Sequence, residues 1–66
     1  MALDIGMTIR ERRRALGLSQ SDVAFTAGVN RRVIGELERG KETVRLDVLR
    51  RVAEALGLDL TFVERT

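Results

Sequence analysis

The most informative part of the chain is Leu18-Ser-Gln-Ser-Asp-Val-Ala-Phe-Thr-Ala-Gly-Val-Asn-Arg-Arg-Val-Ile-Gly-Glu-Leu-Glu-Arg-Gly40. Four residues of helix-boundary types punctuate it: Ser19, Gly28, Asn30 and Gly40. Ser and Asn cap helix N-termini, whereas Gly accepts the left-handed conformation in which helices end. The pattern predicts helices over 20–27 and 31–39 with a turn of about three residues between them, which is a helix-turn-helix.

The segment 31–39 carries the informative face. At 100° per residue, Ile34 and Leu37 fall on one side of the helix. The opposite side carries three arginines, a carboxylate and a glycine: Arg31, Arg32, Gly35, Glu36 and Arg39. A solvated helix face has a similar composition. After a capped helix and a glycine turn, this face is also typical of a recognition helix, because the guanidinium fork can bond guanine edges or grip a phosphate.

The composition restricts the function further. The chain has 66 residues, enough for a single domain (1–66), and no Cys or His, so neither a disulfide nor a metal or cofactor site is expected. Nine of the 12 cations but only five acids lie in 10–45, which leaves a net charge of +4 there. This distribution fits a nucleic-acid partner, although an ordinary basic protein has a similar charge. No apolar run is long enough to cross a membrane, so a cytoplasmic, nucleoid-associated location is expected.

Two further helices are predicted, over about 4–16 and 46–56, from their apolar periodicity. Arg12 and Arg13 flank the apolar stripe of the first, and the spacing does not choose which of them is partly buried. Gln20 begins the 20–27 helix, where it is either a phosphate contact or a plain exposed residue. Phe25 falls outside the apolar pattern, so it is either an accessory core residue or a contact for a partner.

The tail 58–63 changes from a helical period to alternation. Leu58, Leu60 and Phe62 alternate with polar residues, which predicts a half-buried strand. A single strand cannot satisfy its own backbone groups, and the chain offers no other strand. We therefore expect it to pair antiparallel with the same strand of a second copy, giving a homodimer. A frayed terminus is the alternative.

With the helices placed, the sequence resembles the lambda-repressor/Cro-like (XRE) helix-turn-helix family. The matching residues are Ile9 to Gln20, Val23, Ala24, Ala27 to Val29, Ile34, Leu37, Glu38, Gly40, Lys41 and Leu49 to Leu58. The resemblance implies an all-α, compact four-helix domain whose third helix lies in the major groove. The tail is similar to the HipB-like antitoxin branch, in which a C-terminal strand pairs across the dimer. That branch implies a HipA-like kinase toxin as a partner and repression of its own operon.

The family's base-reading positions fall on Arg31, Arg32 and Glu36. Its phosphate-contacting helix ends fall on Gln20 and Asn30. We include Gly35 and Arg39 in the same DNA-contacting face.

Lys41 and Arg45, in the loop before the last helix, lie where the family approaches the DNA backbone. The family's buried ion pair, between the first helix and the end of the third, maps to Arg13 and Glu38. The resemblance therefore selects Arg13, where helical spacing alone left Arg12 and Arg13 open.

The leading hypothesis is a homodimeric repressor that reads a palindromic operator and autoregulates its own operon as an antitoxin does. The alternative is a protein-interaction module that binds a partner such as a toxin without DNA. An enzyme is the least favoured class, because the chain has no His, Cys, Tyr or Trp and no phosphate-binding glycine loop.

Overall fold

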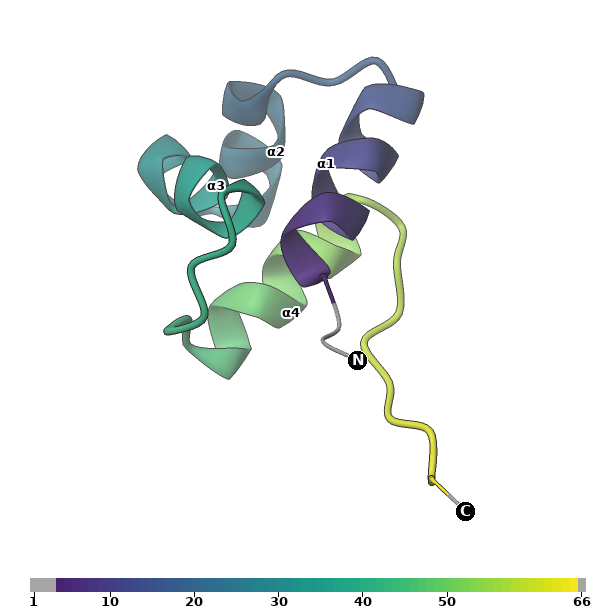
Figure 1. Ribbon diagram of the computed structural model, residues 1–66. Helices are drawn as coiled ribbons and strands as arrows, with labels where there is room; N and C mark the ends of the chain where they lie inside the picture. The colour runs from purple at the N-terminus through teal and green to yellow at the C-terminus, as the bar shows by residue number, and fades with distance from the viewer. Residues whose placement is uncertain (1–3, 66) are drawn as a thin grey trace.

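The computed structural model describes residues 4–65 and shows four helices joined by short loops (Figure 1). They are α1 (Ile5–Ala15), α2 (Gln20–Ala27), α3 (Arg31–Glu38) and α4 (Leu46–Ala55). The predicted all-α class and the four helices are confirmed, and each boundary lies within one residue of the expected one. Residues 4–65 contain no β-strand, so the strand predicted over 58–63 is not seen in the single chain, and its pairing across a dimer stays a prediction.

Hydrogen bonds at the helix ends set the helix-turn-helix. The Ser19 hydroxyl accepts from the Asp22 amide at 3.0 Å, and the Asp22 carboxylate accepts from the Ser19 amide at 2.8 Å, forming a capping box. Asn30 caps α3 by accepting from the Arg32 amide at 2.8 Å. Between them Gly28 adopts a φ of 71°, a left-handed conformation that a side chain would strain. The turn therefore needs glycine at this point.

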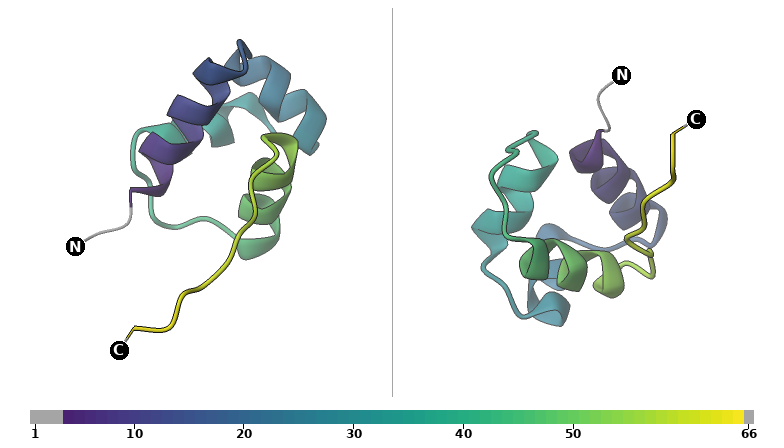
Figure 2. Two further views of the ribbon diagram at one scale, coloured as in Figure 1. Left: turned by 90° about the vertical axis from the view of Figure 1, so that its right-hand side faces the viewer. Right: turned by 90° about the horizontal axis from the view of Figure 1, so that it is seen from below.

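The core lies where the four helices surround a common centre (Figure 2). Small and branched apolar side chains fill it: Ile9, Val23, Ala24, Ala27, Ile34, Leu37, Leu49, Val52 and Leu56. α2 packs on both α3 and α4, and α1 packs on α3. Because Ala24 and Ala27 are short, α2 can lie close to its neighbours, which fixes the orientation of α3.

Two contacts of α1 were not predicted from the sequence. Gly6 is buried against α3 so closely that a Cβ atom there would overlap the backbone carbonyl oxygen of Leu37. Arg12 donates from Nε to the Leu56 carbonyl oxygen at 2.8 Å, which caps the C-terminus of α4. Arg12 and Arg13 are thus both partly buried, each with its own partner.

The segment after α4 leaves the helical body (Figure 1). Leu58 is half-buried against the core, and its amide donates to the Ala53 carbonyl at 2.8 Å. Beyond it Phe62 is 89% and Val63 88% exposed. Burial of Leu60 and Phe62 over the helices, which was expected of a dimer, is not seen in the single chain and stays a prediction. Within residues 4–65, no helix has the length and apolar character needed to span a membrane.

Candidate DNA-binding surface

The outer face of α3 presents exposed guanidinium groups. Arg31, Arg32 and Arg39 are exposed, and no carboxylate of residues 4–65 forms a salt bridge with any of them. Glu36 shares this side of the helix and pairs with Lys41, Oε1 to Nζ, at 3.3 Å. A row of unpartnered cations on one short helix can meet the oxygen atoms of phosphates and guanine edges.

Gly35 is not the exposed bare position that the helical wheel predicted. It is buried, and a Cβ atom there would lie 3.2 Å from Arg39 Nη1 and 3.7 Å from Gln20 Oε1. The wheel places Gly35 correctly on the side of α3 away from the core. However, it cannot show that side chains from α2 and from the end of α3 fold over that position. Flexible side chains therefore cover Gly35, and this covering explains why it is buried although it lies away from the core.

A bidentate ion pair joins α1 to the end of α3. Arg13 Nε donates to Glu38 Oε2 at 2.7 Å, and Arg13 Nη2 donates to Oε1 at 2.9 Å. The two side chains are only 12% and 5% exposed. Arg13 Nη1 donates to the Leu18 carbonyl at 2.9 Å, and the Gln20 amide donates to Glu38 Oε1 at 3.2 Å. The pair therefore ties α1, the α1–α2 loop and α2 to α3.

The surroundings keep this pair charged. Hydrogen bonds from Arg13 lower the pKa of Glu38 below its ordinary value of 4.5 against the opposing effect of burial, and the Gln20 amide and the nearby charge of Arg10 help. The same contact with Glu38 raises the pKa of Arg13. At neutral pH both groups are therefore ionised, and the negative charge of Glu38 is compensated by Arg13.

The predicted phosphate contacts at the helix ends have structural roles in the free protein. The Gln20 side chain is half-buried and bonds to Glu38, so its amide group points into the ion-pair network. The side chain of Asn30 is used as the α3 cap. Both residues nevertheless lie at helix N-termini, where backbone amides and the helix dipole favour anions. Their contacts with DNA stay predictions.

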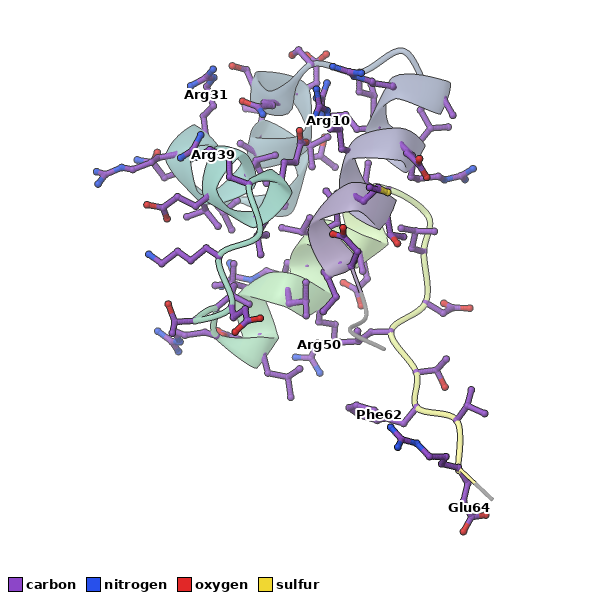
Figure 3. All side chains as sticks on the ribbon, viewed as in Figure 1. Arg10, Arg31, Arg39, Arg50, Phe62 and Glu64 are labelled. Carbon is purple, nitrogen blue, oxygen red and sulfur yellow. The ribbon has the colours of Figure 1, made fainter. Side chains whose placement is uncertain are left out.

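The surface of α3 has cations on both flanks. On the α4 side lie Lys41 and Arg45, and Arg45 also forms an exposed salt bridge with Asp47 at 3.2 Å. On the α1 side is a hollow of about 240 Å³ whose charged walls come from α1 and the end of α3: Arg10, Arg13, Arg14, Glu38 and Arg39. In Figure 3 the labelled Arg10, Arg31 and Arg39 lie in the same half of the molecule, away from Arg50 and Phe62.

No DNA contact was predicted for Arg10 or Arg14 from the sequence. A signal was available, because the two are four residues apart and therefore lie on the face of α1 that also carries Arg13. Five consecutive charged residues, 10–14, obscured this spacing.

Comparison with known proteins agrees with this geometry. A family described as helix-turn-helix matches residues 9–63. An uncharacterized HTH-type transcriptional regulator of Methanothermobacter thermautotrophicus is 45% identical over 49 residues, which are 74% of this chain and 71% of that protein. A second such regulator, from Sinorhizobium fredii, is 37% identical over 57 residues, or 86% of this chain and 75% of the relative.

A solved structure has the same fold. The crystal structure of the restriction-modification controller protein C.AhdI from Aeromonas hydrophila superposes with a TM-score of 0.78 at 39% sequence identity, covering 85% of each chain. The lambda-repressor/Cro-like resemblance is thereby confirmed. The chain belongs to the helix-turn-helix family and is a DNA-binding transcriptional regulator.

Proposed function

We propose that this protein binds a palindromic operator as a two-fold dimer, with α3 in the major groove, and represses transcription there. The observation that carries the proposal is the outer face of α3, where Arg31, Arg32 and Arg39 are exposed with no acidic partner among residues 4–65. A cytoplasmic location, with the DNA, follows from this role.

Arg31 and Arg32 are the proposed base readers. Both are in the first turn of α3, and the N-terminal residues of a recognition helix are those that contact base edges. Each can bond guanine O6 and N7 with two parallel hydrogen bonds, worth about 1–3 kcal/mol of discrimination against the wrong base.

Glu36 is the third proposed base contact. Its bond to Lys41 joins partly exposed side chains, and such surface pairs contribute only about 0–1 kcal/mol. The pair can therefore exchange on DNA at little cost. Glu36 then accepts from a cytosine amino group, and Lys41 turns to a phosphate.

The C-terminal segment is the proposed dimer contact. Leu58, Leu60 and Phe62 line an open groove against α4 together with Leu46, which is also exposed. A second copy would cover these apolar groups and pair the backbone of 58–63. The two α3 helices would then lie about 34–36 Å apart, or a multiple of that, one per half-site.

The regulated gene is a separate question with two candidates. The resemblance of the tail to HipB-like antitoxins supports autoregulation beside a kinase toxin. The likeness to a restriction-modification controller protein supports control of such a system instead. Mapping the protein on the chromosome of its own host would distinguish them by the genes beside the occupied sites.

The proposal is tested by selecting bound sequences from random duplex DNA. We expect an inverted repeat to be enriched, and affinity for it to fall steeply with salt. Arg31→Ala and Arg32→Ala are each expected to cost about 1–3 kcal/mol and to relax selection at one position of each half-site. Unchanged binding by both variants would contradict the assignment of α3.

One observation favours a protein partner as well. Phe25 is 90% exposed on α2, so it is not a core residue. If the chain were only an interaction module, no sequence would be enriched and no salt-dependent DNA binding would be found.

A further inference from the structure

We propose that the hollow beside α3 is a further phosphate-binding site, in which Arg10 and Arg14 of α1, with Arg39, bind the DNA backbone. This extends the DNA-binding surface from the helix-turn-helix onto the first helix. The inference rests on the proposed function, because it concerns the same bound DNA.

The charges in the hollow are unbalanced. Four guanidinium groups and one carboxylate line it. Arg13 neutralises Glu38 through the bidentate bond, and the remaining three arginines are exposed, with no salt-bridge partner among residues 4–65. Such a concave cluster of unpaired cations favours a phosphate oxygen over water.

The position of the hollow matches the shape of DNA. Arg39 belongs both to the hollow and to the outer face of α3. The opposite flank of α3 carries Lys41 and Arg45. A helix in the major groove, which is about 12 Å wide, has a phosphate backbone on each side. Cations on both flanks therefore fit a helix held between two phosphate backbones. On the α1 flank, α2 offers only the neutral side chain of Gln20, and Arg10 and Arg14 add the positive charge.

Glu38 does not oppose this arrangement. Its pKa is lowered and its carboxylate already accepts from Arg13 and Gln20, so its charge is compensated within the protein. A phosphate in the hollow would meet the outer guanidinium groups of Arg10, Arg14 and Arg39 first, since these are the exposed ones.

The experiment compares how steeply the DNA-binding constant of each variant falls with salt concentration. Arg10→Gln, Arg14→Gln and the double variant are titrated with the selected operator and with a duplex of random sequence over a range of salt. Each lost phosphate contact should lower the slope of log K against log salt by about 0.9, and the double variant by about 1.8. The affinity ratio of parent to single variant should shrink about 3.5-fold for each fourfold rise in salt. Both duplexes should be affected alike, because phosphates carry no base sequence.

Arg65→Gln is the matched control. It removes the same charge from an exposed side chain of the C-terminal segment, beyond the proposed dimer strand 58–63 and far from α3 (Figure 1). Its slope should equal the parent's. Sedimentation of every variant checks that the dimer is unchanged, and a melting curve checks that the loss of Arg10 beside Glu38 has not unfolded the chain.

The outcomes separate this inference from the proposed function. Suppose that Arg31→Ala weakens operator binding while the double variant keeps the parent's slope of log K against log salt. The phosphate-binding site is then wrong, and the assignment of α3 as the recognition helix is retained. If the parent binds no duplex in a salt-dependent way, both fail. Inorganic phosphate, titrated at constant ionic strength while the melting temperature is followed, probes the hollow without DNA. A rise that the double variant loses, with DNA binding intact, would assign the hollow to a free anion and overturn the inference.

Discussion

The α1–α3 contact and the segment after α4 both carry groups that need a partner, but they obtain it differently. At the α1–α3 contact, Arg13 and Glu38 meet within the chain, and among residues 4–65 no buried side-chain polar atom lacks a hydrogen bond. In the tail, Leu60, Phe62 and Val63 remain exposed. A helix satisfies its own backbone and needs only a packed face, whereas an extended segment needs a neighbour for both backbone and side chains. The first region is therefore complete within one chain, whereas the second is the place where we propose that another copy packs.

The largest expected effect is at the ion pair. Glu38→Ala leaves Arg13 buried without its counter-charge, which should cost about 3–5 kcal/mol of unfolding free energy. For a domain this small, that lowers the melting temperature by about 12 °C or more. Thermal and urea unfolding measure it, and Glu38→Gln, which keeps an acceptor oxygen, should lose less. A melting temperature close to the parent's would show that the contact is dispensable.

The next largest effect is expected where α1 and α3 approach each other closely at Gly6. Gly6→Ala places a methyl group against the Leu37 carbonyl, which α1 can relieve only by moving away, so we expect a loss of about 1–3 kcal/mol. Gly35→Ala is the matched control. There the nearest obstacle is the flexible tip of Arg39, and alanine favours the helix. Equal losses in the two variants would argue against a close α1–α3 contact.

Low pH should selectively reduce the stabilisation that the Arg13–Glu38 pair gives to the α1–α3 contact. The folded protein lowers the pKa of Glu38, so the unfolded chain binds more protons in the acid range. The stabilisation by the pair is fully present above about pH 4.5, the ordinary value, and is lost as the pH falls through the lower pKa of the folded state. Unfolding curves of the parent and Glu38→Gln should converge on acidification. The lowered pKa of Asp22 acts in both proteins and cancels from their difference. A constant difference in stability would contradict the assignment.

The smallest effect on the helical body is expected from the tail. Replacing Leu60 and Phe62 with Ser should change the free energy of unfolding of the monomer by less than about 0.5 kcal/mol, because both side chains are exposed in the single chain. The same variant should sediment as a monomer at concentrations where the parent is a dimer. Leu58→Ser, at a side chain packed against the core, should destabilise the body as well. Persistent dimers of the double variant would place the dimer contact elsewhere.

Local sequence signals predicted most of the helical framework. Ser19 and Asn30 carry their capping oxygen in the side chain, and Gly28 takes a conformation that few other residues tolerate, so these boundaries depend on a few neighbouring residues. The apolar period of α4 predicted its buried face for the same reason, and the basic outer face of α3 followed from the arc opposite Ile34 and Leu37.

Which elements meet depends on how the helices pack, and not on the pattern within any one of them. The period of α1 could not show that Gly6 touches the Leu37 carbonyl, that Arg12 caps α4, or that Gln20 and Arg39 cover Gly35, because each contact joins positions that helix packing brings together. The hollow formed by Arg10, Arg14 and Arg39 is of the same kind, since its walls come from α1, α2 and the end of α3. The local residue pattern sets the conformation of each helix and the charge of each face. The packing of α1, α2 and α3 determined which charges are neutralised and which remain for a ligand, because electrostatic pairing depends on distances that no single helix sets.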